Sequence, residues 1–145
     1  MNLVDQQWRT TRRPAPSTPA PDVPPIFDVV VADDSEIVRA HLVALLEATD
    51  GIRVVGQADD TPRLLEMVDA LRPHVVVLDI SMPGGNGIKA LQHIKAAHPD
   101  TRVVMLTNHS NEFYRKKCMS TGAAFFLDKS SEFERIGEVI AMLMA

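Results

Sequence analysis

Five polar residues in this sequence each stand at the end of a run of apolar residues. Asp33 and Asp34 follow "VVVA", Asp79 follows "VVVL", Thr107 ends "RVVMLT" and Lys129 ends "AAFFLDK". Three carboxylates that converge repel one another and raise one another's pKa values. A hard dication such as Mg²⁺ relieves this repulsion through oxygen ligands. A carboxylate held beside such an ion and a lysine is suited to attack a phosphoryl group, so phosphoryl transfer is the chemistry that these residue types indicate.

The apolar runs are the strands and helices that must position these residues. Stretches of period two or of continuous apolar character predict strands at 26–34, 52–58, 74–80, 102–107 and 123–129. Helices are expected at 35–48, 61–71, 87–98, 111–121 and from 131 onward. The helix at 35–48 is predicted to turn one face to the core, made of Ile37, Val38, His41, Leu42, Leu45 and Leu46.

Capping residues give the expected helix ends. Thr61 and Pro62 form a cap and first turn, and Ser131 with Glu134 forms a capping box for the last helix. Gly122 ends the helix at 111–121.

Strands that alternate with helices through short loops predict a doubly wound parallel sheet with helices on both faces. In the order 2-1-3-4-5, strands one, three, four and five are neighbours, and ligands bind at their carboxyl edge. The five polar residues then meet at one place, with Asp79 as the central carboxylate and nucleophile. Asp59 and Asp60 follow the outer strand and are interpreted as solvated turn residues.

Composition excludes several classes of protein. The 145 residues suit one domain, 46% of them are hydrophobic, and the net charge of −4 argues against direct binding of nucleic acid. A single cysteine, Cys118, excludes an internal disulfide and a thiolate zinc site. With neither a membrane-spanning run nor a signal peptide, a cytoplasmic location is expected.

Residues 1–25 differ in composition from the rest. They hold six of the ten prolines and few large apolar groups, so a disordered proline-rich tail is expected there. The folded domain is expected at 26–145, with no output domain after the last helix.

Residues 26–145 resemble the receiver domain of two-component response regulators, a flavodoxin-like fold. The resemblance rests on "VVVADDS", "VVVLDISMPGGNG", "VVMLT" and "GAAFFLDK", in that order. It implies that Asp79 is the phosphoacceptor and that Asp34 holds Mg²⁺ directly, with Asp33 acting directly or through water. The backbone carbonyl of Ser81 completes the metal site by the same resemblance. Lys129 pairs with the phosphoryl group, and Thr107 hydrogen-bonds it after activation.

The resemblance also implies partners and a switch. Phe126 stands where such domains carry a switching aromatic residue, although a plain core role is equally open. The phosphodonor would be a sensor histidine kinase or a histidine phosphotransfer protein. A downstream protein target would bind the face of helix four, strand five and helix five (111–121, 123–129 and from 131), which includes Tyr114, Lys117 and Cys118.

Three residues depart from the family pattern. Asn108 and His109 follow Thr107, where a small residue commonly comes first, and Ser130 follows Lys129, where many receivers have proline. These departures affect expected rates and partners and remove no catalytic group.

The same residues argue against two other classes of protein. A haloacid-dehalogenase-type hydrolase needs a second Asp at position 81, which is serine. A dinucleotide-binding domain needs a glycine-rich turn where Asp33 and Asp34 stand, and they would repel a phosphate. A pseudo-receiver, an interaction module that is not phosphorylated, remains the alternative.

Overall fold

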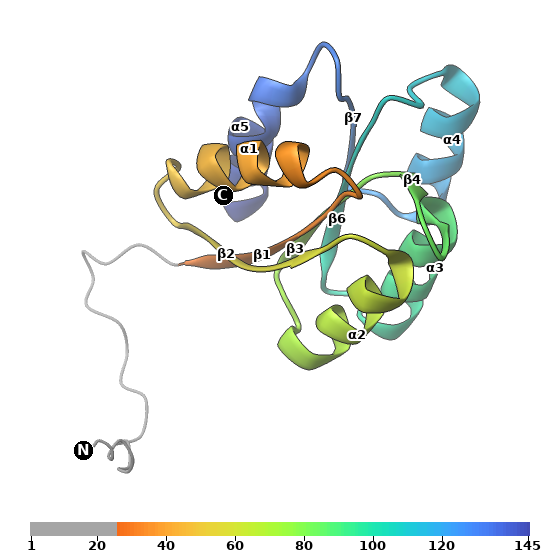
Figure 1. The fold of residues 1–145 in the computed structure, drawn as a ribbon, viewed down its shortest axis with the longest axis horizontal. Coiled ribbons are helices and arrows are strands. Elements are labelled where there is room, and N and C mark those ends of the chain that lie inside the picture. The colour runs from red at the N-terminus through yellow and green to blue at the C-terminus, as the bar shows by residue number, and fades with distance from the viewer. Residues whose placement is uncertain (1–25) are drawn as a thin grey trace.

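A five-stranded parallel sheet forms the centre of the computed structural model, which describes residues 26–145 (Figure 1). Its order is β2-β1-β3-β6-β7, with β1 at Phe27–Ala32, β2 at Ile52–Ala58, β3 at Val75–Leu78, β6 at Arg102–Thr107 and β7 at Phe125–Asp128. Counted as main strands this is 2-1-3-4-5, so the predicted doubly wound topology is confirmed. The tail predicted at residues 1–25 lies outside the described residues.

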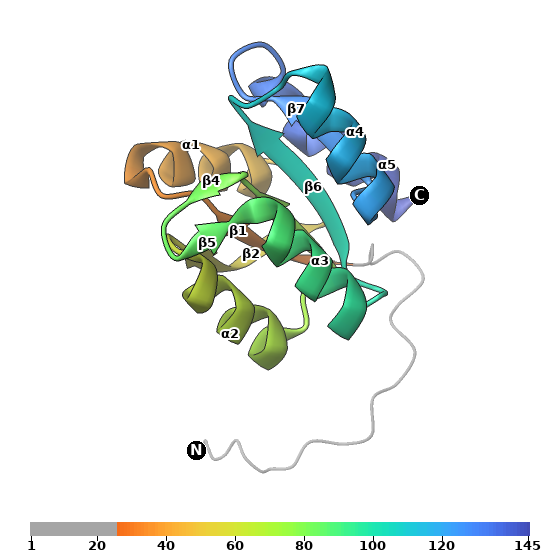
Figure 2. The same ribbon diagram turned by 90° about the vertical axis from the view of Figure 1, so that its right-hand side faces the viewer.

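Helices cover both faces of the sheet (Figures 1 and 2). One layer contains α1 (Glu36–Glu47) and α5 (Ile136–Met144), and the other contains α2 (Thr61–Leu71), α3 (Gly87–Ala97) and α4 (Glu112–Thr121). The strands divide their side chains between the two layers, as Val29 and Val30 on β1 illustrate. All four residues of β3 are buried because a central parallel strand has helices on both sides.

A short hairpin and a turn of 3₁₀ helix were not predicted from the sequence. Strands β4 (Ser81–Met82) and β5 (Gly85–Asn86) pair antiparallel between β3 and α3. Their turn needs Gly84 and Gly85, whose φ angles are 84° and 141°. The 3₁₀ helix η1 (Phe133–Arg135) precedes α5. Both elements follow the carboxyl ends of strands and flank the loops that carry Asp79 and Lys129.

Two predicted caps are wrong. The side chain of Asp60, interpreted as a solvated turn residue, accepts a hydrogen bond from the Arg63 N–H and caps α2, so Thr61 is the first helical residue. The capping box of Ser131 and Glu134 does not form, because the chain makes η1 there and α5 begins at Ile136 without a side-chain cap.

The inward face of α1 is narrower than its periodicity indicates. Leu42 and Leu46 are buried, whereas Ile37 is 83% exposed and His41 is exposed and packs against Phe133. Ile37 lies on the solvent side of the first turn, whereas the neighbouring Val38 packs against the core. None of the helices in residues 26–145 has the length and apolar character that crossing a bilayer requires.

Candidate functional site

A pocket of about 280 Å³ opens at the carboxyl edge of the sheet, where the sequence predicts a site. The loops after β1, β3, β6 and β7 form it, and its lining consists of Asp33, Asp34, Ser35, Val38, Asp79, Ser81, Asn108, His109 and Lys129. Five of the seven predicted site residues, Asp33, Asp34, Asp79, Ser81 and Lys129, therefore line one cavity.

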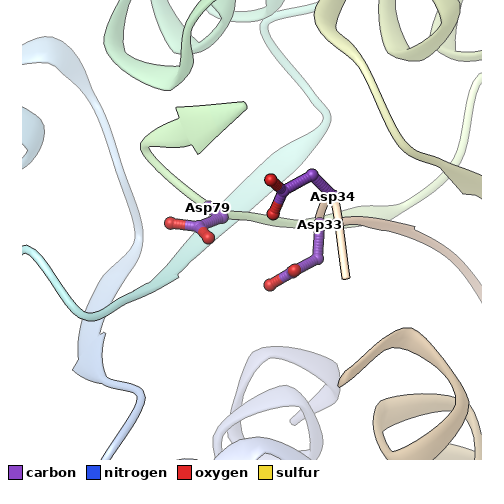
Figure 3. Close-up of side chains that lie close together, drawn as sticks. All are labelled: Asp33, Asp34 and Asp79. Atoms are coloured by element: carbon purple, nitrogen blue, oxygen red, sulfur yellow. The ribbon is translucent and has the colours of Figure 1, made fainter. Parts of the chain in front are cut away.

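Three carboxylates converge in this pocket (Figure 3). One oxygen from each of Asp33, Asp34 and Asp79 lies within 4.8 Å of the others. Asp33 and Asp79 are buried, whereas Asp34 is exposed at the mouth. Buried like charges at this spacing need a counter-charge, and three oxygen donors with an open side suit Mg²⁺, which keeps several waters. The residues present thus fit a divalent cation.

Lys129 joins the two buried carboxylates. Its Nζ donates to Oδ2 of Asp33 at 2.6 Å and to Oδ2 of Asp79 at 2.8 Å. Burial lowers the pKa of the ammonium, but the two hydrogen bonds and the charges of Asp33 and Asp79 together outweigh burial, so the pKa of Lys129 is raised. The ammonium therefore remains charged and balances one of the two buried negative charges.

The backbone holds the other oxygen of each buried carboxylate. Oδ1 of Asp33 accepts from the Ser35 N–H at 2.9 Å, and Oδ1 of Asp79 accepts from the Ser81 N–H at 3.2 Å. Both aspartates use the same turn geometry, in which the side chain binds the backbone two residues on. Each carboxylate is thereby oriented with Oδ2 toward Lys129. Two Asp-x-Ser sequences were the signal that could have revealed this arrangement.

Gly87 brings the start of α3 directly against the backbone of Asp79. A Cβ atom added at Gly87 would lie 2.4 Å from the Asp79 carbonyl oxygen and 2.6 Å from Cα of Ile80. These neighbours are backbone atoms, which cannot move away as a flexible side chain can. Gly87 also donates its N–H to the carbonyl of Ile80 at 2.7 Å. Only glycine permits this close approach, so Gly87 helps to hold Asp79 in place, a role that the sequence analysis missed.

Neither Thr107 nor Phe126 lines the pocket. Thr107 is fully buried at the end of β6, and its Oγ1 accepts from the His109 N–H at 3.1 Å. Phe126 is 4% exposed, and the guanidinium of Arg115 lies 4.9 Å from its ring centroid. Phe126 belongs to the core layer of α2, α3 and α4, so its burial fits either of the two roles considered for it.

Comparison with known proteins identifies the class of domain. The family model described as the response regulator receiver domain matches residues 29–141. The chain belongs to this family. Among curated relatives, response regulator GacA of Pseudomonas viridiflava is 32% identical over 117 residues, which cover 81% of this chain and 55% of GacA. Response regulator UvrY of Escherichia coli O157:H7 is 34% identical over 115 residues, which cover 79% of this chain and 53% of UvrY.

Solved receiver domains have the same fold. The signal receiver domain of response regulator NarL from Mycobacterium tuberculosis matches with a TM-score of 0.78 and 31% identity, over 83% of this chain and 98% of that one. The isolated REC domain of RcsB from Salmonella enterica serovar Typhimurium, solved in the presence of the phosphomimetic BeF₃⁻, matches with a TM-score of 0.77 and 27% identity, over 81% of this chain and 88% of that one.

Family membership gives the class of this domain. The domain is a response regulator receiver of two-component systems, with the predicted flavodoxin-like fold. The chain spans about half the length of the curated relatives it matches. The predicted absence of an output domain and the cytoplasmic location therefore stay predictions, as do the roles of individual site residues.

Proposed function

We propose that this receiver accepts a phosphoryl group on Asp79 in a Mg²⁺-dependent reaction and signals its phosphorylation state to a protein partner. The observation that carries this proposal is the arrangement of Asp79: its Oδ2 lies 2.8 Å from the Lys129 ammonium, in a pocket with Asp33 and Asp34. Family membership supports it independently. The donor would be a phosphohistidine on a sensor histidine kinase or a histidine phosphotransfer protein.

The transfer requires one bond to form and one to break. A carboxylate oxygen of Asp79 attacks phosphorus, the P–N bond of the phosphohistidine breaks, and its electron pair returns to the imidazole, which takes up a proton. Asp33, Asp34, Asp79 and the Ser81 carbonyl would hold Mg²⁺, which supplies charge neutralisation at the phosphoryl oxygens. Lys129 would move its ammonium from Asp79 to the incoming phosphoryl oxygen, a short movement within the same pocket.

Hydrolysis of the phosphoryl group would end the signal. Water attacks phosphorus, the bond to Asp79 breaks, and inorganic phosphate leaves with the carboxylate regenerated. We assign no other catalytic activity to this domain. Phosphotransfer to itself and slow self-dephosphorylation are the reactions that this set of residues supports.

The output surface proposed for the phosphorylated form is the face of α4, β7 and α5. The Thr107 hydroxyl would turn to the phosphoryl group, and Phe126 would follow within the core. Cys118, expected on this face from the sequence, is instead fully buried in the core. Phe113 and Met119 on α4 are exposed by 70% and 44%, so this helix offers apolar side chains to a protein target. A pull-down that compares the beryllofluoride-bound wild type with Asp79→Ala would identify such a target, with no direct contact to nucleic acid expected.

A phosphorylation assay distinguishes this proposal from the alternative, a pseudo-receiver that is not phosphorylated. Wild type, Asp79→Asn and the control Asp100→Asn would be incubated with acetyl phosphate, with Mg²⁺ or with a chelator. We expect phosphate incorporation by intact mass in wild type and Asp100→Asn, only with Mg²⁺. An amide is a poor nucleophile of nearly the same shape, so Asp79→Asn should fold and stay unmodified. Incorporation at equal stoichiometry in Asp79→Asn, or none in wild type, would contradict the proposal.

A further inference from the structure

The carboxylate of Asp128 joins two loops of the site from outside the pocket. Its Oδ2 accepts from the Ser110 hydroxyl at 2.6 Å, and its Oδ1 accepts from the Ser130 N–H at 2.8 Å and the Ser130 hydroxyl at 2.6 Å. Ser110 belongs to the loop between β6 and α4, and Ser130 to the loop after β7. Asp128 thus connects the loop that follows Thr107 with the loop that carries Lys129.

The main chain of Asp128 is also fixed. Its N–H donates to Oε1 of Glu132 at 2.9 Å, and its carbonyl accepts from the Glu132 N–H at 2.7 Å. Lys129 in turn donates its N–H to the Thr107 carbonyl at 2.9 Å. Apart from Oδ2, which binds Ser110, the polar groups of Asp128 therefore all close the turn in which Lys129 stands.

This network accounts for serine at position 130. A proline there would have a fixed φ but no N–H to donate. Serine instead gives the Asp128 carboxylate two donors, so side-chain hydrogen bonds replace the rigidity of a ring. The hydrogen bond from Ser110, followed by those from Ser130, lowers the pKa of Asp128 to about 2, so the carboxylate is charged at neutral pH. Hydrogen bonds to an ionised acceptor are the stronger kind.

We propose that Asp128 is a positioning residue for phosphoryl transfer, which holds the Lys129 loop and the loop of Asn108 and His109 at a fixed separation across the pocket. The inference rests on the proposed phosphorylation of Asp79. The Lys129 side chain must span the distance from its own loop to both Asp33 and Asp79. The position of the Lys129 backbone therefore decides whether the ammonium can reach the two carboxylates. Asn108 and His109 line the pocket beside Lys129, so the Ser110 tie also sets the width of the opening.

The test compares Asp128→Ala, Ser110→Ala, their double variant and Ser110→Thr, each in the full chain. The control is Asp60→Ala. The Asp60 carboxylate lies at the same edge of the sheet and also accepts a backbone hydrogen bond, from the Arg63 N–H. It contacts neither the loop of Asn108 and His109 nor the loop of Lys129. Three quantities are measured: the phosphorylation rate constant at saturating acetyl phosphate, the Kd for Mg²⁺ by calorimetry, and the melting temperature.

Positioning predicts a specific pattern. Asp128→Ala should lower the rate constant about tenfold and Ser110→Ala about threefold, since small displacements of a catalytic group are costly. The Kd for Mg²⁺ should change less than about twofold, because its carboxylates lie on other loops. Ser110→Thr should restore the rate, and the double variant should be no slower than Asp128→Ala. Asp60→Ala should lose stability but keep its rate.

Two results would overturn the inference. One is a rate constant for Asp128→Ala equal to that of wild type while wild type is phosphorylated. The other is a crystal structure of Asp128→Ala in which Lys129 keeps both of its carboxylate contacts, a result independent of phosphorylation. A wild type that takes up no phosphate would contradict the proposed function alone, and the crystal structure would still decide the positioning role. If Asp128→Ala does not fold, Ser110→Ala gives the same comparison.

Discussion

The ammonium of Lys129 lies 2.8 Å from the carboxylate of Asp79, although their strands, β7 and β3, are separated by β6. The same ammonium reaches Asp33, which follows β1, one strand further away. One lysine therefore spans four neighbouring strands at the carboxyl edge of the sheet. It binds two of the three carboxylates of the cluster, so a divalent cation held by that cluster would compete with Lys129 for Asp33 and Asp79.

Lys129→Gln should tighten Mg²⁺ binding about tenfold, or about 1.4 kcal/mol, because the competing ammonium is removed. In a chelating buffer the free energy of unfolding of the same variant should be lower by about 2 kcal/mol. Breaking a fully buried ion pair costs roughly 3–5 kcal/mol, and the cost is smaller here because the pocket is open to solvent. Calorimetry and urea unfolding measure the two effects. Lys89→Gln, on the exposed side of α3, is the control, and weaker Mg²⁺ binding by Lys129→Gln would refute the competition.

Asp34→Asn should separate metal binding from folding. Asp34 is the exposed member of the carboxylate cluster, so the variant should melt like wild type in a chelator. At a Mg²⁺ concentration 100 times the wild-type Kd, wild type gains about 2.7 kcal/mol, and a tenfold loss of affinity would reduce this gain by about 1.3 kcal/mol. Thermal unfolding with and without Mg²⁺ measures the difference. An equal gain in both proteins would mean that Asp34 does not hold the ion.

Asn108→Ala should shorten the lifetime of the phosphorylated form. Asn108 is exposed and lines the pocket, where its amide occupies space and can bind a water away from the line of attack on phosphorus. Removing the amide should speed decay about threefold, or about 0.7 kcal/mol of barrier. Single-turnover decay with excess Mg²⁺ measures this. A lifetime equal to or longer than that of wild type would show that Asn108 is only loop surface.

Acid should weaken the fold partly through Asp128. The hydrogen bond from Ser110 and those from Ser130 lower its pKa from 3.8 to about 2, so the unfolded chain binds the proton more readily. The stabilisation is complete above about pH 5 and is lost as the pH falls through 4 toward 2. Urea unfolding between pH 2 and 6 should show a smaller pH dependence for Asp128→Asn than for wild type. The hydrogen bond with His98 also lowers the pKa of Asp69, so Asp69 contributes to the pH dependence of both proteins. The contribution of Asp128 is therefore the difference between wild type and Asp128→Asn. Identical slopes would contradict this assignment.

The order of strands and helices was predictable because each is encoded locally. Continuous aliphatic runs such as "VVVL" mark buried parallel strands, and right-handed crossovers leave few topologies. Once the topology is known, Asp33, Asp34, Asp79 and Lys129 must meet at the carboxyl edge. The convergence of the site therefore follows from the sequence alone.

Helix ends and exposed turns were predicted less well because they depend on what the neighbouring loop offers. Thr61 looks like a cap, but Asp60 provides the acceptor and the hairpin of β4 and β5 packs against Thr61, whose N–H donates to the Pro83 carbonyl. Ile37 follows the helical period, yet it is exposed while the neighbouring Val38 packs against the core. Periodicity identifies the face of a helix but not where that face ends.

Side-chain pairs across loops were decided only by the tertiary structure. That one lysine binds both Asp33 and Asp79, and that Asp128 ties Ser110 to Ser130, depends on backbone positions separated by up to 96 residues. Sequence patterns show which strand ends are neighbours. They do not show which side chain of another loop a given residue meets, because that depends on backbone positions that only the tertiary structure brings together, as for Asp128 and Ser110.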